Sequence, residues 1–125
     1  MNADSEALSC ASQEVANALR QSADRLEARA PELAERTRMR AAAFDRIRAQ
    51  AAERAAPFRH ATLEELGTIY VQIATAATEL ADFVVALESC SADEMAIGRS
   101  GAVAALGTLT RLAAAAERLL RLDAH

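Results

Sequence analysis

The sequence has little of what β-rich folds, metal sites and disulfide frameworks require. Its 125 residues include four glycines, two prolines, no tryptophan and 3% aromatic residues. A β-rich domain of this length would need many more turn-forming residues. The two cysteines, Cys10 and Cys90, lie far apart with no Cys or His at ligand spacing, so the pattern indicates neither a zinc site nor a redox pair. We expect two separate reduced thiols.

Lysine is also absent, and the fourteen basic residues are all arginines. Eighteen acidic residues outnumber them and give a net charge of −4, with a pI of about 5.2. This balance argues against a general polyanion binder. The N-terminus, MNADSEALSC, lacks the pattern of a secretion signal, and no apolar run approaches the roughly 20 residues of a membrane span. We therefore expect a soluble, cytoplasmic protein with no membrane segment.

Strong helix formers make up much of what is present. Alanine, leucine, arginine and glutamate dominate the chain, and all four favour helix. The chain is 52% hydrophobic and 26% charged, a composition typical of globular proteins. Its length suits one hydrophobic core. We predict an all-α fold, an antiparallel helical bundle with coiled-coil-like seams that forms a single domain over residues 1–125.

Pro31 leaves two arrangements open for the first part of the chain. Proline suits the first turn of a helix, so the stretch APEL can open a new helix in a bundle of four. However, Arg29 and Ala30 offer neither a glycine for a turn nor a good cap. The apolar seam also keeps its phase through the proline. That continuity favours a kink in one long helix, and hence three helices, over a hairpin.

Pro57 ends the second helical pattern, because the residue before a proline is pushed out of helical geometry. The stretch TLEE then reads as a capping box, in which Thr62 and Glu65 satisfy free amides at a helix start. An apolar seam follows in steps of three and four: Leu63, Leu66, Tyr70, Ile73, Ala77, Leu80, Val84 and Leu87. Further apolar positions widen the stripe: Ile69, Ala76 and Phe83. We expect this helix to contact two neighbours.

The last helix is predicted to start at Ser91, with Glu94 completing a capping box. Gly98, Gly101 and Gly107 each weaken it by up to about 1 kcal/mol relative to alanine. We expect close packing against a partner helix to offset this cost. The final residues, ERLLRLDAH, are candidates for fraying.

Charge is segregated along the sequence. Residues 20–59 hold ten arginines and six acids, whereas residues 60–98 hold seven acids and no arginine. If these segments form adjacent antiparallel helices, their opposite charges attract across the hairpin. Each exposed pair contributes only about 0 to 1 kcal/mol, so the effect is on the choice of pairing more than on stability.

The window ERTRMRAAAFDRIR, residues 35–48, raises the question of nucleic-acid binding. Its arginines do not gather along one face of a helical wheel, and acids are interleaved with them. A helix that enters a DNA groove needs its basic residues on one side, so we interpret the window as a solvent-facing surface with ion pairs. Arg36 and Arg40 are candidates for a charged contact. Arg40 falls close to the apolar stripe, where it snorkels to water or reaches an acid on a neighbouring helix or chain.

His60 is the one candidate for group-transfer chemistry. An exposed neutral imidazole can accept a phosphoryl group, which makes His60 an alternative phosphoacceptor, although we favour a histidine in the connection before Thr62. Glu79 and Asp82 lie one turn apart, but iron bundles pair glutamate with histidine at that spacing, so we interpret them as a solvated face. The chain has no phosphate loop, zinc signature or nucleophile elbow. We predict no catalytic residue, no metal, no cofactor and no enzymatic activity.

The apolar seams carry the functional prediction. The residues that we expect to bind a partner lie on two of these seams: Leu66, Tyr70, Ile73, Leu80, Leu106 and Leu109. They predict a helical protein–protein interaction module that forms a homodimer or binds a partner protein through an apolar helix face. The alternative is a signalling or ligand-sensing bundle that works through His60 or a small-molecule pocket near Tyr70.

In length and in its alanine-rich long helices, the chain resembles in general type the small bacterial adaptors, secretion chaperones and secreted helical hairpins. This resemblance implies an adaptor-like or chaperone-like role. The Trp-X-Gly turn of one secreted group is absent, because the chain has no tryptophan.

Overall fold

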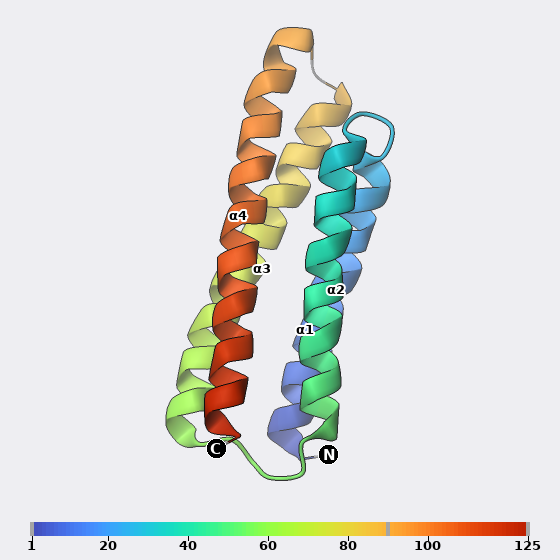
Figure 1. Cartoon of the computed structure of the whole chain (residues 1–125). Coiled ribbons are helices and arrows are strands. Elements are labelled where there is room, and N and C mark those ends of the chain that lie inside the picture. The colour runs from blue at the N-terminus through green and yellow to red at the C-terminus, as the bar shows by residue number, and fades with distance from the viewer. Residues whose placement is uncertain (1, 90, 125) are drawn as a thin grey trace.

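Four helices make up most of the described chain. In the computed structural model, which describes residues 2–89 and 91–124, α1 spans Ala3–Leu26, α2 spans Pro31–Glu53, α3 spans His60–Ser89 and α4 spans Ala92–Asp123. They alternate in direction along one long axis (Figure 1). The predicted all-α antiparallel bundle is therefore confirmed, in its four-helix form.

Pro31 separates two helices. The carbonyl of Leu26, the last residue of α1, accepts the amides of Arg29 at 3.1 Å and Ala30 at 2.7 Å. Pro31 is the first residue of α2, where a missing amide proton costs nothing. The kink favoured by the phase of the seam is wrong. The phase is kept because Leu26, Ala30 and Leu33 are all buried at the turn, so both helices face one core.

The four helices form two hairpins. Within each hairpin the helices pack along each other, α1 on α2 and α3 on α4, and the hairpins meet where α1 contacts α3 and α2 contacts α4. α2 and α3 lie diagonally across the core, and their described backbones make no close approach to each other (Figure 1). The expected attraction between residues 20–59 and 60–98 across one hairpin is therefore wrong for α2. Its arginines pair with acids of the first hairpin and of α4 instead: Arg38 with Glu27 at 2.6 Å, and Arg46 with Glu117 at 3.3 Å.

The apolar seams form the interior of the bundle. On α3 the deepest positions of the predicted seam are buried: Leu66, Ile73, Leu80, Val84 and Leu87. The predicted two-sided contact is confirmed, since α3 packs on both α1 and α4. At the centre, the rings of Phe44 on α2 and Tyr70 on α3 meet edge to face at 6.4 Å.

Two of the three glycines of α4 lie at close approaches to α3. A Cβ atom at Gly101 would overlap the ring of Phe83, and one at Gly98 would lie 2.9 Å from the side chain of Leu87. The predicted packing compensation is confirmed for these two. At Gly107 the nearest atom is Nη1 of Arg111 at 3.8 Å, so packing within the chain does not require that glycine.

A buried carboxylate closes the lower end of the bundle. Asp123, the last residue of α4, forms an ion pair with Arg54, accepts the Thr62 hydroxyl at 2.7 Å and accepts the amide of Arg59 at 3.2 Å. The Arg54 guanidinium also lies 4.2 Å from the centre of the Phe58 ring. This group, which we call the Asp123 clamp, joins α4 to the start of α3 and to the residues that follow α2.

The Asp123 clamp corrects two predictions. α3 begins at His60, so Thr62 lies inside the helix and its hydroxyl donates to Asp123 instead of capping. The end of the chain is not frayed as far as Asp123, which is buried. The Ser91 and Glu94 capping box of α4, in contrast, is confirmed. Cys10 is a free exposed thiol, whereas Cys90 lies outside the described residues.

The upper end has a clamp of its own. Arg29, in the connection between α1 and α2, donates to the carbonyls of Leu87 at 3.3 Å and Glu88 at 3.0 Å. These carbonyls belong to the last turn of α3, where a positive charge is favourable. Each end of the bundle therefore has an arginine that ties one hairpin to the other.

We expect Asp123→Asn to lower the free energy of unfolding by about 3 kcal/mol, because Arg54 would keep its buried charge without a counter-ion. Burial raises the pKa of Asp123, but the hydrogen bonds from Thr62 and the Arg59 amide and the charge of Arg54 outweigh it and leave the pKa below its usual value. The contribution of Asp123 to the free energy of unfolding is therefore fully present above about pH 4 to 5, and it is lost as the pH falls below that range. Urea unfolding at several pH values measures both effects, and an unchanged acid limb in the variant would contradict the assignment.

The glycines of α4 provide a second, matched prediction. Gly107→Ala should raise the free energy of unfolding by up to about 1 kcal/mol, since nothing lies within contact of the added methyl except a mobile arginine tip. Gly101→Ala should lower it by about 1 to 3 kcal/mol, because the methyl would overlap Phe83. Denaturant unfolding of the two variants side by side tests the packing, and equal effects would refute it.

Candidate interaction surface on α3 and α4

The residues predicted to bind a partner lie inside the bundle. Five of the six are buried in the core: Leu66, Ile73, Leu80, Leu106 and Leu109. The sixth, Tyr70, is half-buried, and its hydroxyl lies 2.6 Å from that of Ser12 on α1. While the bundle is closed, these side chains have almost no surface to offer a partner. A partner surface on the folded chain must therefore involve other residues.

An apolar surface runs along the outside of the α3–α4 hairpin. It contains a recess of about 430 Å³ near the end of α4, lined by Ile69, Leu119 and Leu122 among others. A second recess of about 370 Å³ near the start of α4 is lined by Phe83, Ala86 and Ile97 among others. We call the surface that links the two recesses the outer groove. Its outermost large side chains are Ile97, 73% exposed, and Leu122, 58% exposed.

α4 carries two apolar stripes. The first faces the core through Ala102, Leu106, Leu109, Ala113 and Leu120. The second has steps of three and four and no charged residue: Ile97, Gly101, Ala104, Thr108, Leu112, Ala115, Leu119 and Leu122. Part of the second stripe packs on α3, where Phe83 lies against Gly101. The remainder faces outward, which is what a helix with a further neighbour would present.

α3 is unusually hydrophobic for a helix with so much exposed surface. Among the described residues it is the helix that is long and apolar enough by composition to cross a membrane, with a mean hydropathy of 1.3 over its most apolar 18 residues. We expected no apolar segment to approach the length of a membrane span, and α3 corrects that expectation. A core helix of a soluble protein passes the same test, yet only 22% of this window is buried. Much of the apolar character of α3 therefore lies outside the core.

Charged side chains of opposite sign border the outer groove. On the α3 side the exposed residues are Glu65 and Glu79, and on the α4 side they are Arg111 and Arg118, with Glu94 at the start of α4 beside the second recess. Glu65 and Arg118 line the same recess. No ion pair joins these two described side chains within the chain. The groove thus has an apolar floor, an acidic edge on α3 and an edge on α4 that is basic at Arg111 and Arg118 and acidic at Glu94.

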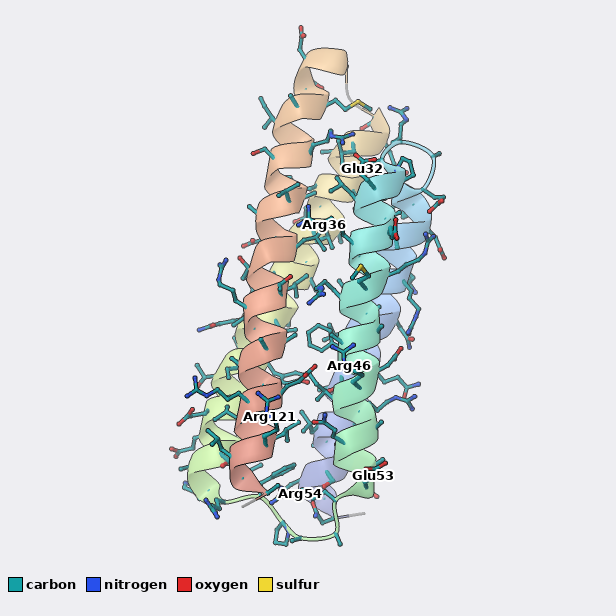
Figure 2. The ribbon with its side chains drawn as sticks, in the orientation of Figure 1. Glu32, Arg36, Arg46, Glu53, Arg54 and Arg121 are labelled. Atoms are coloured by element: carbon teal, nitrogen blue, oxygen red, sulfur yellow. The ribbon has the colours of Figure 1, made fainter. Side chains whose placement is uncertain are left out.

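Within the described chain other residues make the charged contacts between helices, so a contact of Arg36 or Arg40 with another chain stays a prediction. Arg40 is half-buried and Arg36 is exposed, and neither pairs with an acid among the described residues. Figure 2 shows Arg36 and Arg46 on α2 beside α4. The pairs that bridge these helices are Arg46 with Glu117 and Arg99 with Glu32. Their residues belong to the two hairpins, so the contact holds the bundle together.

His60 is the first residue of α3, not part of a connection. Its side chain is 86% exposed, and its Nε2 lies 3.1 Å from Oε1 of Glu64. No group of three or more His, Cys, Asp or Glu side chains that could hold a metal occurs among the described residues. The surroundings of His60 therefore amount to one carboxylate and solvent.

A smaller recess of about 200 Å³ lies between α1 and α3, where the sequence suggested a pocket near Tyr70. Leu8, Phe58 and Tyr70 line it, with Asp4 as its one charged lining residue. Burial raises the pKa of Tyr70 to about 12, so the phenol is neutral at physiological pH. Gly67 also lines the recess and has nothing within 4 Å of an added Cβ.

No protein-family model, no curated protein and no solved structure matches this chain.

The buried phenol of Tyr70 leads to a prediction about the stability of the protein at alkaline pH. Its pKa in the folded chain is raised to about 12 by burial, whereas the phenol of an unfolded chain has a pKa of about 10. The contribution of Tyr70 to the free energy of unfolding should therefore be fully present below about pH 10. It should fall as the pH rises from about 10 to about 12. Tyr70 is the single tyrosine, so tyrosinate absorbance during alkaline titration reports on it alone. Ionisation at the ordinary pKa without loss of structure would contradict the burial.

Proposed function

We propose that this protein is a non-enzymatic helical interaction module that binds apolar helices in its outer groove. The observation that carries the proposal is the second apolar stripe of α4, which ends in two exposed side chains, Ile97 and Leu122, each beside a recess. A large apolar surface with charged edges is typical of a protein interaction site.

The dimensions of the outer groove support a helical partner. From Ile97 to Leu122 the groove is about 38 Å long, at about 1.5 Å per helical residue. That is the length of a helix of about 25 residues. Such a helix, with apolar residues every third or fourth position, could place side chains in both recesses. The helices of this chain, at 23 to 32 residues, have that length.

A second candidate function is ligand sensing through the recess beside Tyr70. The observation that favours it is Gly67, a glycine inside α3 that no contact in the chain requires. A thermal-shift screen separates the two proposals. Ligand-dependent stabilisation that Gly67→Leu removes would support sensing, whereas melting that depends only on protein concentration would support association.

The outer groove can be tested with single charged substitutions. Ile97→Glu and Leu122→Glu should weaken association by at least about ten-fold, because each places a carboxylate in the apolar floor of the groove. Val71→Glu is the matched control, since Val71 is 68% exposed on α3 and lines neither recess. Sedimentation equilibrium measures association, and thermal melts verify that each variant is folded.

Two results would count against this proposal. One is association that Val71→Glu weakens and Ile97→Glu leaves unchanged, which would move the interface to another face of α3. The other is a wild-type chain that stays monomeric up to about millimolar concentration and binds no synthetic peptide of residues 97–122, since that peptide carries the apolar stripe that fits the groove.

A further inference from the structure

We propose that the occupant of the outer groove is a second copy of this chain, related by a two-fold axis parallel to the helices. Each α4 then lies over α3 of the other copy, and Arg118 faces Glu65 of the partner subunit. The inference rests on the proposed function, and it adds the identity of the partner and its orientation.

Symmetry leaves few ways for one face to meet its own copy. A closed dimer is isologous, so the two-fold axis lies in the plane of the shared face. When the axis runs parallel to the helices, α4 of one copy meets α3 of the other. When the axis runs across the helices, α4 meets α4 and α3 meets α3. The charges at the edges of the groove distinguish these two arrangements.

The heights of residues on α3 and α4 are known from their contacts. Gly98 is level with Leu87, and Gly101 is level with Phe83. Because the helices are antiparallel, residues further along α4 are level with residues nearer the start of α3. Arg118 and Glu65 accordingly line the same recess. An axis parallel to the helices preserves height and exchanges α3 with α4, so it places Arg118 opposite Glu65 of the partner subunit, twice in each dimer.

An axis across the helices sets like charges against each other. To place Ile97 opposite Leu122 of the partner subunit, it would put Arg111 within one turn of the partner's Arg111. It would also lay α3 along α3, a helix that has no lysine or arginine of its own and carries these exposed carboxylates without an arginine partner in the described chain: Glu64, Glu65, Glu79 and Asp82. Like charges across an interface select against the arrangement that contains them. The parallel axis brings acidic and basic edges together instead.

In the dimer with the parallel axis, the apolar side chains of one copy also lie level with the recesses of the other. Ile97 would lie over the partner's recess beside Phe83 and Ala86, with which it is level in its own chain. Leu122 would lie over the recess beside Ile69. Both of the exposed side chains of the groove would be covered in each copy, and both recesses would be filled.

The area of the outer groove is sufficient for a stable dimer. It is about 38 Å long and two helices wide, roughly 20 Å at the usual helix spacing. The face is therefore roughly 760 Å² per copy, close to the roughly 800 Å² per partner of a standard-size protein interface. A second copy of the chain can supply a face of this size and shape without any additional segment.

Charge reversal tests the orientation. Arg118→Glu and Glu65→Arg should each raise the dissociation constant of the homodimer about ten-fold, because like charges then face each other at both contacts. An equimolar mixture of the two variants should return to within about three-fold of the wild type, since opposite charges face each other again across the mixed dimer. Arg121→Glu is the control, because Arg121 lines a recess with Gln50 and Glu53 of α2 and lines neither recess of the outer groove. Sedimentation with one variant fluorescently labelled reports the mixed species.

The outcomes separate this inference from the proposed function. If Ile97→Glu abolishes association but the mixture stays as weak as the single variants, the groove is the interface and the orientation is overturned. A strictly monomeric wild-type chain overturns the inference, while binding of the 97–122 peptide to that monomer would preserve the proposed function.

Discussion

The burial of one carboxylate at the end of α4 is the constraint on which the arrangement of the helices depends. Asp123 has its charge compensated by Arg54, and its other partners come from the start of α3. These groups come from segments that only meet when both hairpins are in register. Since an unpaired buried charge is costly, a shift of one hairpin along the other is strongly disfavoured. The clamp of Arg29 on α3 restrains the opposite end.

This register also determines which apolar surfaces remain outside. The two hairpins use one side of each helix for the shared core, and the diagonal placement of α2 and α3 keeps the charged face of α2 against α4. The back of the α3–α4 hairpin has no such neighbour in the chain. Its apolar floor between an acidic and a basic edge is thus a product of the topology as much as of the sequence.

Helical periodicity was sufficient to predict the fold and the core, because a step of three or four residues reports directly on burial, as at Leu66 and Ile73. It could not decide at Pro31, since a kink and a hairpin share one phase when both helices face the same core. The local cap signature at Thr62 failed because Asp123, distant in sequence, accepts both the Arg59 amide and the Thr62 hydroxyl, and α3 begins before Thr62. The stripe from Ile97 to Leu122 is visible in the sequence, but only the assembled bundle shows that it faces outward.

The contact of Phe83 with Gly101 has a consequence for recognition. The ring occupies the space that a side chain would need, so neither α3 nor α4 can turn about its own axis without a collision. The back of the hairpin is accordingly preorganised, and a molecule that docks there meets a rigid template. Little conformational entropy is then lost on complex formation, which leaves more of the favourable desolvation of apolar groups to set the affinity.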